Sequence, residues 1–171
     1  MISCKFPCTN RKVARERRTG SGARLAAMSD DPFRHRIRVR YSECDQQGVV
    51  FYPHYLAWFD IAMTELFRAG GHPYGEMIDG GADMVVAEAG IRYRASAQFD
   101  EEIDLAARVT RLGSTSITTA ISAQRSDNGE VLAEGELRHV FVDLATRRTR
   151  EIPPRVREAL APFMAEAEPI T

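Results

Sequence analysis

The chain has 171 residues, of which 44% are hydrophobic and 27% charged. This length suits one domain with a single well-filled core and is short for two. No apolar run approaches the roughly 18 to 20 residues that a membrane-spanning helix needs, so we expect no membrane association. Three cysteines, Cys4, Cys8 and Cys44, are too few for a disulfide framework or a structural zinc site. We therefore predict a cytoplasmic protein in a reducing compartment, with no metal.

The formal net charge of -1 hides an asymmetry between the start of the chain and the rest. Through Met28 there are seven Lys and Arg residues and one acid, whereas the remainder has 16 Arg and 23 Asp and Glu residues. We predict a basic, disordered extension over 1–28 and a single domain over 29–171. Three interpretations of the extension stay open: a transit-like peptide, a basic interaction arm, and, favoured over these, residues upstream of a true start at Met28. An acidic body argues against nucleic acid as a partner, because phosphate binding depends on Lys and Arg.

Residues 33–41 alternate between apolar or aromatic residues and arginines, which predicts a strand with one wet face. A polar segment over 42–48 follows. Large apolar residues then recur at helical spacing and predict a helix from near Pro53 to Ala69. Pro suits the first turn of a helix, and Gly70-Gly71 supplies the stop.

The rest of the sequence predicts an α+β domain. Asp127-Asn128-Gly129 indicates a tight hairpin, because Asn and Gly tolerate positive φ. We expect strands at 83–96, 102–112, 114–125 and 130–144, a short helical piece at 76–78 and a final helix after Pro153-Pro154. The order of elements predicts one antiparallel sheet curled around one long helix, plus the C-terminal helix.

Asp45 is the first candidate for chemistry. It lies in a loop that leads into the predicted helix, three residues before Gly48 and next to the largely apolar run Val49 to Tyr52. A carboxylate there is expected to lie partly desolvated beside the free N–H groups of a helix N-terminus. Such a pair suits attack on a carbonyl carbon, with the N–H groups receiving the oxyanion. The alternative is that Asp45 only caps a turn.

Residues 41–56 resemble the signature of the 4-hydroxybenzoyl-CoA thioesterase family of hotdog-fold proteins. The pattern is an Asp, two residues, a Gly, an apolar pair, an aromatic pair and then a Tyr at the helix start. A weaker resemblance continues through Tyr93, the segment 97–101 and the predicted hairpin, so that it covers roughly residues 33 to 150. The Tyr52-Pro53 pair resembles the branch acting on aromatic thioesters.

The resemblance implies a five-stranded antiparallel hotdog sheet and an acyl-CoA thioester hydrolase that uses no cofactor beyond water. It implies homodimers, or dimers of dimers, with active sites at the subunit boundary. Asp45 would be the nucleophile or the general base, and the backbone N–H of Tyr52 would polarise the thioester carbonyl. The implied substrate-binding residues are Gly48, Val50, Phe51, His54 and Tyr55.

Several alternatives stay open at this level. His54 is a candidate acid or base, but a histidine at a helix start also commonly faces solvent. Another hotdog branch uses a glutamate on the central helix. Here the corresponding candidate is Glu65, but helical spacing places it on a different side of the helix from Tyr52. The aromatics Tyr52, Tyr55, Trp58 and Phe59 would line either an acyl pocket or the core.

Other functions also remain. A non-catalytic acyl-binding protein would keep the fold without turnover. A hotdog hydratase or dehydratase needs a histidine with an acid on the central helix, and the nearest pair, His54 and Asp60, lies on different helix faces. The sequence does not distinguish coenzyme A from acyl carrier protein as the thiol carrier.

Overall fold

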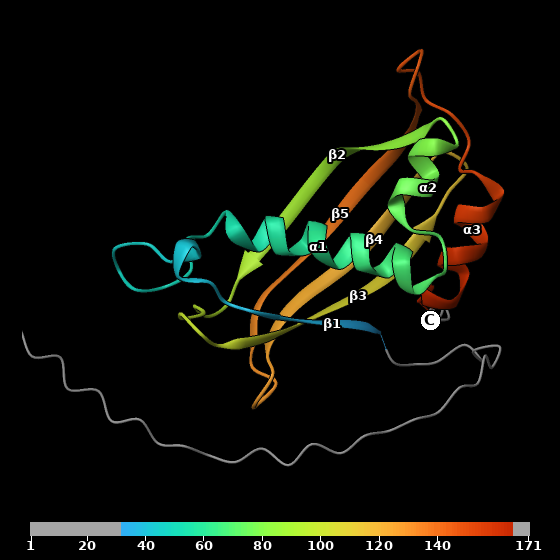
Figure 1. The fold of residues 1–171 in the computed structure, drawn as a ribbon. Coiled ribbons are helices and arrows are strands. Elements are labelled where there is room, and N and C mark those ends of the chain that lie inside the picture. Colours follow the sequence, from blue (N-terminus) through green and yellow to red (C-terminus); the bar gives the residue numbers. More distant parts are fainter. Residues whose placement is uncertain (1–31, 166–171) are drawn as a thin grey trace, which may run out of the picture.

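The computed structural model describes residues 32–165, and Figure 1 shows their arrangement. The predicted boundary near residue 28 and the cysteines Cys4 and Cys8 lie outside these residues. The strands are β1 (Phe33–Arg38), β2 (Ala82–Tyr93), β3 (Glu102–Leu112), β4 (Ser116–Arg125) and β5 (Val131–Asp143). The α-helices are α1 (His54–Ala69), α2 (Tyr74–Asp79) and α3 (Pro154–Leu160), and short 3-10 turns occupy Tyr41–Glu43 and Ala161–Phe163.

One five-stranded sheet carries the fold, in the order β1-β3-β4-β5-β2, and every neighbouring pair is antiparallel. The alternation predicted for the first strand is present, since Phe33, His35 and Ile37 are half-buried while the intervening arginines are exposed. On the exposed face Arg36 forms a bidentate ion pair with Asp104 of β3. The six-residue β1 and the twelve-residue β2 are the two edges of the sheet.

Helix α1 lies across one face of the sheet (Figure 1). It begins after Pro53 and ends at Ala69, with Gly70 as its C-cap, as predicted. Its apolar stripe is buried against the inward-facing residues of β3, β4 and β5, which include Leu105, Ile121 and Phe141. The residues that α1 buries are Tyr55, Trp58, Phe59, Ala62, Met63, Leu66 and Phe67. Sheet and helix thus share one core, as the sequence predicted.

The expected strand boundaries differ from the structure mainly at two turns. The strand predicted to reach residue 96 ends at Tyr93, and the strand predicted from residue 114 begins at Ser116. The second difference has a local cause, because Gly113 N–H donates to the Ser116 carbonyl at 2.9 Å and closes a tight turn. The short helical piece is longer than predicted and runs over Tyr74–Asp79.

Gly135 is required where α1 crosses β5. A Cβ there would lie 2.2 Å from the Gly90 carbonyl oxygen of β2 and 3.0 Å from Phe59 of α1. We expect Gly135→Ala to lower the free energy of unfolding by about 2 kcal/mol or more, because the Gly90 carbonyl belongs to the paired backbone of β2 and cannot move aside cheaply. Gly75→Ala is the matched control, because its Cβ meets nothing within 4 Å. Chemical denaturation of both variants tests this, and equal midpoints would contradict it.

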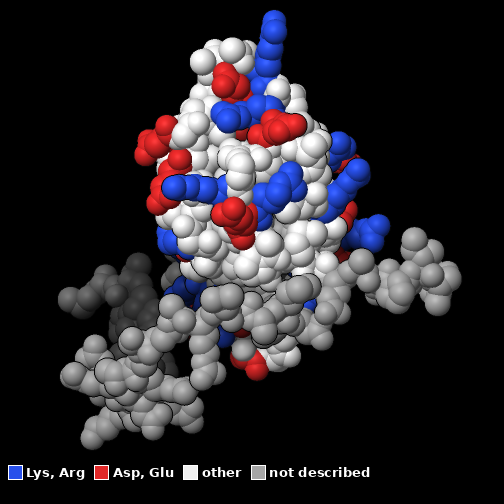
Figure 2. Space-filling view, turned by 90° about the vertical axis from the view of Figure 1, so that its right-hand side faces the viewer, with Lys and Arg blue, Asp and Glu red and all other residues white. Residues whose placement is uncertain are grey.

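No helix among residues 32–165 is long and apolar enough to cross a bilayer. The face seen in Figure 2 carries basic and acidic side chains interspersed, rather than a patch of one sign.

Candidate active site

The loop before α1 is a closed turn. Cys44 and Val50 form an antiparallel bridge, and inside it Asp45 N–H donates to the Val49 carbonyl at 2.9 Å. Gly48 N–H donates back to the Asp45 carbonyl at 3.0 Å. Gly48 has φ +77, a left-handed conformation that side chains with a Cβ rarely adopt. The glycine three residues after Asp45 therefore serves the tight turn, as the sequence indicated.

The Asp45 side chain is half-buried, and one of its oxygens caps the turn. Oδ1 accepts the Gln47 N–H at 2.8 Å. The turn-capping interpretation is therefore correct for this oxygen. The second oxygen, Oδ2, has no hydrogen-bond or ion-pair partner among the described residues, and no arginine there neutralises the carboxylate. One oxygen is positioned and the other is available to a ligand.

The start of α1 offers an unused backbone donor. Phe51 N–H donates to the Glu43 carbonyl at 2.9 Å, and His54 N–H donates to the Phe51 carbonyl at 3.0 Å. Between them, the N–H of Tyr52 has no acceptor within residues 32–165. A free N–H at a helix start carries part of the positive end of the helix dipole and suits an oxyanion.

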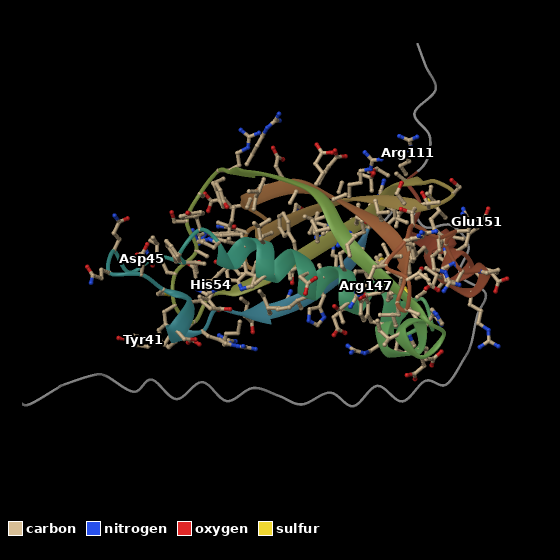
Figure 3. All side chains as sticks on the ribbon, turned by 90° about the horizontal axis from the view of Figure 1, so that it is seen from above. Tyr41, Asp45, His54, Arg111, Arg147 and Glu151 are labelled. Atoms are coloured by element: carbon tan, nitrogen blue, oxygen red, sulfur yellow. The ribbon has the colours of Figure 1, made fainter. Side chains whose placement is uncertain are left out.

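Asp45 and the helix start border the same open cavity of about 720 Å³. Figure 3 places Asp45, His54 and Tyr41 at one end of the molecule, away from Arg111 and Glu151. The residues that line the cavity are Tyr41, Ser42, Cys44, Asp45, Gln46, Gly48, Phe51, His54 and Phe99. Phe51 and His54, on either side of the Tyr52-Pro53 pair, bring the start of α1 to the cavity that Asp45 lines, although Tyr52 itself is not among the lining residues.

Two of the expected substrate-binding residues are instead part of the core. Val50 is 4% exposed and Tyr55 is 2% exposed. The Tyr55 hydroxyl accepts the Ala97 N–H at 3.0 Å, and burial raises the pKa of this phenol. Trp58 and Phe59 are also buried in the core. Of the four aromatics considered for an acyl pocket, only Tyr52 is exposed.

The structure adds two side chains that sequence reasoning did not select. Glu43 accepts the Trp58 Nε1–H at 3.0 Å, which ties the loop before α1 to the helix itself. The hydroxyl of Tyr93, at the end of edge strand β2, donates to the Tyr52 carbonyl at 3.1 Å. Neither contact has a signal in the sequence, because each joins segments that only the fold brings together.

A second, smaller cavity of about 220 Å³ lies between α1, α2, β2 and β5. His139 lines it, is 4% exposed, and its Nδ1 has no hydrogen-bond partner. Burial lowers the pKa of this imidazole, which Asp60 partly offsets by raising it. Apart from Asp60, His139 and Thr64, the walls are apolar or aromatic, with Met63, Phe67, Tyr74, Met84 and Val86. Asp60 thus shares a cavity with His139 and not with His54.

Comparison with known proteins decides the family. The model of the thioesterase-like superfamily matches residues 39–160. The chain belongs to this superfamily. It is 29% identical to the acyl-CoA thioester hydrolase YbgC of Escherichia coli, over 74% of this chain and 93% of the relative. It is 27% identical to a 1,4-dihydroxy-2-naphthoyl-CoA hydrolase of Synechococcus, over 67% of this chain and 80% of the relative.

Among solved structures, the PA5185 protein of Pseudomonas aeruginosa superimposes with a TM-score of 0.74 at 28% identity. The match covers 81% of this chain and 96% of that one. The sheet of five antiparallel strands with its helices is the hotdog fold, as predicted. Membership of the thioesterase-like superfamily agrees with the resemblance, at a coarser level than the 4-hydroxybenzoyl-CoA branch.

The helix glutamate used by another hotdog branch has a structural role here. Glu65 is half-buried and ion-pairs with Arg68 one turn along α1, and this hydrogen bond lowers the pKa of the carboxyl. It is not among the residues that line either the Asp45 cavity or the His139 cavity. Glu65 therefore lies away from the Asp45 cavity, as the helical spacing predicted.

Proposed function

We propose that this chain hydrolyses acyl-CoA thioesters, with Asp45 as the reacting carboxylate and the Tyr52 N–H as the oxyanion donor. The observation that carries the proposal is the half-buried carboxylate with one unpartnered oxygen, placed across one cavity from a helix start with a free N–H. Similarity to acyl-CoA thioester hydrolases supports the reaction class.

Two routes use the same groups. In the first, Asp45 attacks the thioester carbon, the C–S bond breaks, and water then hydrolyses the mixed anhydride. In the second, Asp45 takes a proton from a water molecule as the water oxygen attacks the same carbon. In both routes negative charge develops on the carbonyl oxygen, where the Tyr52 N–H stabilises it. After a single turnover in oxygen-18 water, label in the Asp45 carboxyl identifies the first route, because it enters when water attacks the Asp45 carbon of the anhydride, whereas the second route leaves Asp45 unlabelled.

The active unit in this proposal is a homodimer paired through β2. This edge strand is twelve residues long and exposes Val85 and Val86, and such an edge favours pairing with another strand. A two-fold axis through the middle of β2 would place the Tyr93 end of one copy beside the Met84 end of the other. The helix start of one copy, which Tyr93 contacts, would then face the His139 cavity of its partner. A dimer of dimers would repeat this unit.

The acyl group in this proposal is a hydroxylated aromatic acid that enters the His139 cavity. The apolar walls suit a ring, and the unpaired Nδ1 of His139 and the Asp60 carboxylate suit a hydroxyl group at its far end. The relative that acts on 1,4-dihydroxy-2-naphthoyl-CoA supports this class of acyl group. We propose a cytoplasmic location and coenzyme A as the thiol carrier.

Thiol release from a panel of substrates tests the proposal. We expect turnover of 4-hydroxybenzoyl-CoA and 1,4-dihydroxy-2-naphthoyl-CoA, with kcat/KM about tenfold or more above that for benzoyl-CoA, because a buried polar group left unpaired costs binding energy. Short-chain acyl-CoAs as best substrates would overturn the aromatic assignment. Binding without thiol release across the panel would favour an acyl-binding protein, and hydration of an enoyl-CoA would favour a hydratase.

A further inference from the structure

The hydroxyl of Tyr93, on the edge strand β2, contacts the backbone at the start of α1. The peptide plane that carries the Tyr52 N–H also carries the Phe51 carbonyl, which accepts His54 N–H at 3.0 Å. The next peptide plane carries the Tyr52 carbonyl. Tyr55 N–H reaches this carbonyl at 3.4 Å, which is long for a hydrogen bond, whereas the Tyr93 hydroxyl reaches it at 3.1 Å.

The ring of Tyr93 reinforces the same contact. It packs edge-on against Tyr52, with centroids 6.2 Å apart, and against Tyr55, with centroids 5.5 Å apart. Tyr55 is buried and fixed by its bond from Ala97, whereas Tyr52 is 60% exposed. Tyr93 therefore links the exposed Tyr52 to the buried Tyr55, and such edge-on aromatic pairs are stabilising.

We propose that Tyr93 is a positioning residue that sets the orientation of the Tyr52 N–H for the thioester oxyanion. Planar peptide units leave two soft dihedrals per residue. His54 N–H holds the Phe51 carbonyl and the Tyr93 hydroxyl holds the Tyr52 carbonyl, so the peptide planes on both sides of Tyr52 are restrained and its N–H keeps one direction. An oxyanion donor that is already oriented needs no reorganisation during the reaction. This inference rests on the proposed function, and it assigns to the edge strand β2 a role in the chemistry.

Tyr93 is not itself a proton donor to the substrate in this scheme, because its hydroxyl is engaged by the Tyr52 carbonyl. Desolvation raises the pKa of this phenol, so the hydroxyl keeps its proton through neutral pH. A positioning role therefore predicts that loss of the hydroxyl changes the rate without changing the shape of the pH profile.

The test is Tyr93→Phe, which removes the hydroxyl and keeps the ring. We expect kcat for a thioester substrate to fall about tenfold while KM changes less than about twofold, since removal of a direct oxyanion donor costs about 10² to 10³ and this effect is indirect. Thr110→Val is the matched control. It removes one hydroxyl that bonds the backbone carbonyl of Thr118 from a strand remote from the site.

A second measurement does not depend on turnover. Amide hydrogen exchange of a peptide that covers residues 51–56 should be faster in Tyr93→Phe than in Thr110→Val. Unchanged kcat, a change confined to KM, or unchanged exchange over 51–56 would overturn the positioning role. Absence of turnover in the unmodified protein would instead overturn the proposed function, and the exchange experiment would still decide whether Tyr93 holds the helix start.

Discussion

Asp45→Asn is expected to lower kcat/KM for a thioester by at least about a hundredfold, because an amide neither attacks an acyl carbon nor accepts a proton from water at neutral pH. The structure indicates that the turn would survive this substitution. Asp45 holds the turn through one oxygen that accepts the Gln47 N–H, and the oxygen of an asparagine amide can accept the same kind of bond. Asn128 accepts the Glu130 N–H through Oδ1 at 2.9 Å. Steady-state thiol release by the purified variant measures the effect.

Asp79→Asn is the control, since Asp79 is exposed at the end of α2 and lines neither cavity. Both variants should melt within about 2 °C of the unmodified protein, because neither removes a buried contact. Hydrolysis by Asp45→Asn at the unmodified rate would refute the assignment of the carboxylate. A loss accompanied by unfolding would instead show that the charge of Asp45 stabilises the loop, and Asp45→Glu would then separate charge from position.

The fold could be predicted because its signals are periodic and repeated along the chain. The alternation over 33–41 and the apolar stripe from Leu56 to Phe67 each contain several residues that agree with one another. The strands β3, β4 and β5 are consecutive and antiparallel, so sequence order was enough to place them as neighbours. Where boundaries shifted, as at Ser116, a single backbone hydrogen bond in a turn decided the outcome.

The candidate site could be proposed from the sequence only where its residues are close together in the chain. Asp45, Gly48 and Tyr52 lie within eight residues, and their spacing carried the prediction. His139 could not be connected to Asp60 because they are almost 80 residues apart, and only the packing of β5 against α1 brings them to one cavity. The burial of Tyr55 also escaped prediction, since a residue at the first turn of a helix can face either the core or the solvent. Local sequence patterns do not specify how β5 packs against α1.

The separation of the two cavities within one copy makes the dimer the central structural expectation. In a single chain, Asp45 lies at the Tyr93 end of β2 and the His139 cavity lies at its Met84 end. The nine residue steps from Met84 to Tyr93 span roughly 30 Å of strand, which is longer than a benzoyl group. The two cavities share no lining residue within one copy, and we expect a hydroxyaryl thioester to reach both where they belong to different copies.

A heterodimer of two inactive variants tests this arrangement. One copy carries Asp45→Asn, and the other carries Thr64→Phe, which fills the 220 Å³ cavity from α1. Each variant alone should be inactive toward 4-hydroxybenzoyl-CoA. When the two copies carry different affinity tags and are purified through both, one site combines an intact Asp45 with an intact cavity. The heterodimer should then recover about half of the unmodified activity, because one of its two equivalent sites is whole.

The opposite arrangement gives an opposite result. If each site lies within one copy, the heterodimer contains one chain without the carboxylate and one without the cavity, and no activity returns. A heterodimer of Asp45→Asn with the unmodified chain controls for the tags and should retain half of the activity in either arrangement. Thermal melting of Thr64→Phe controls for folding, because overpacking can itself destabilise a core. Recovery in the mixed pair combined with inactivity of both parents can arise only from a site that two copies share.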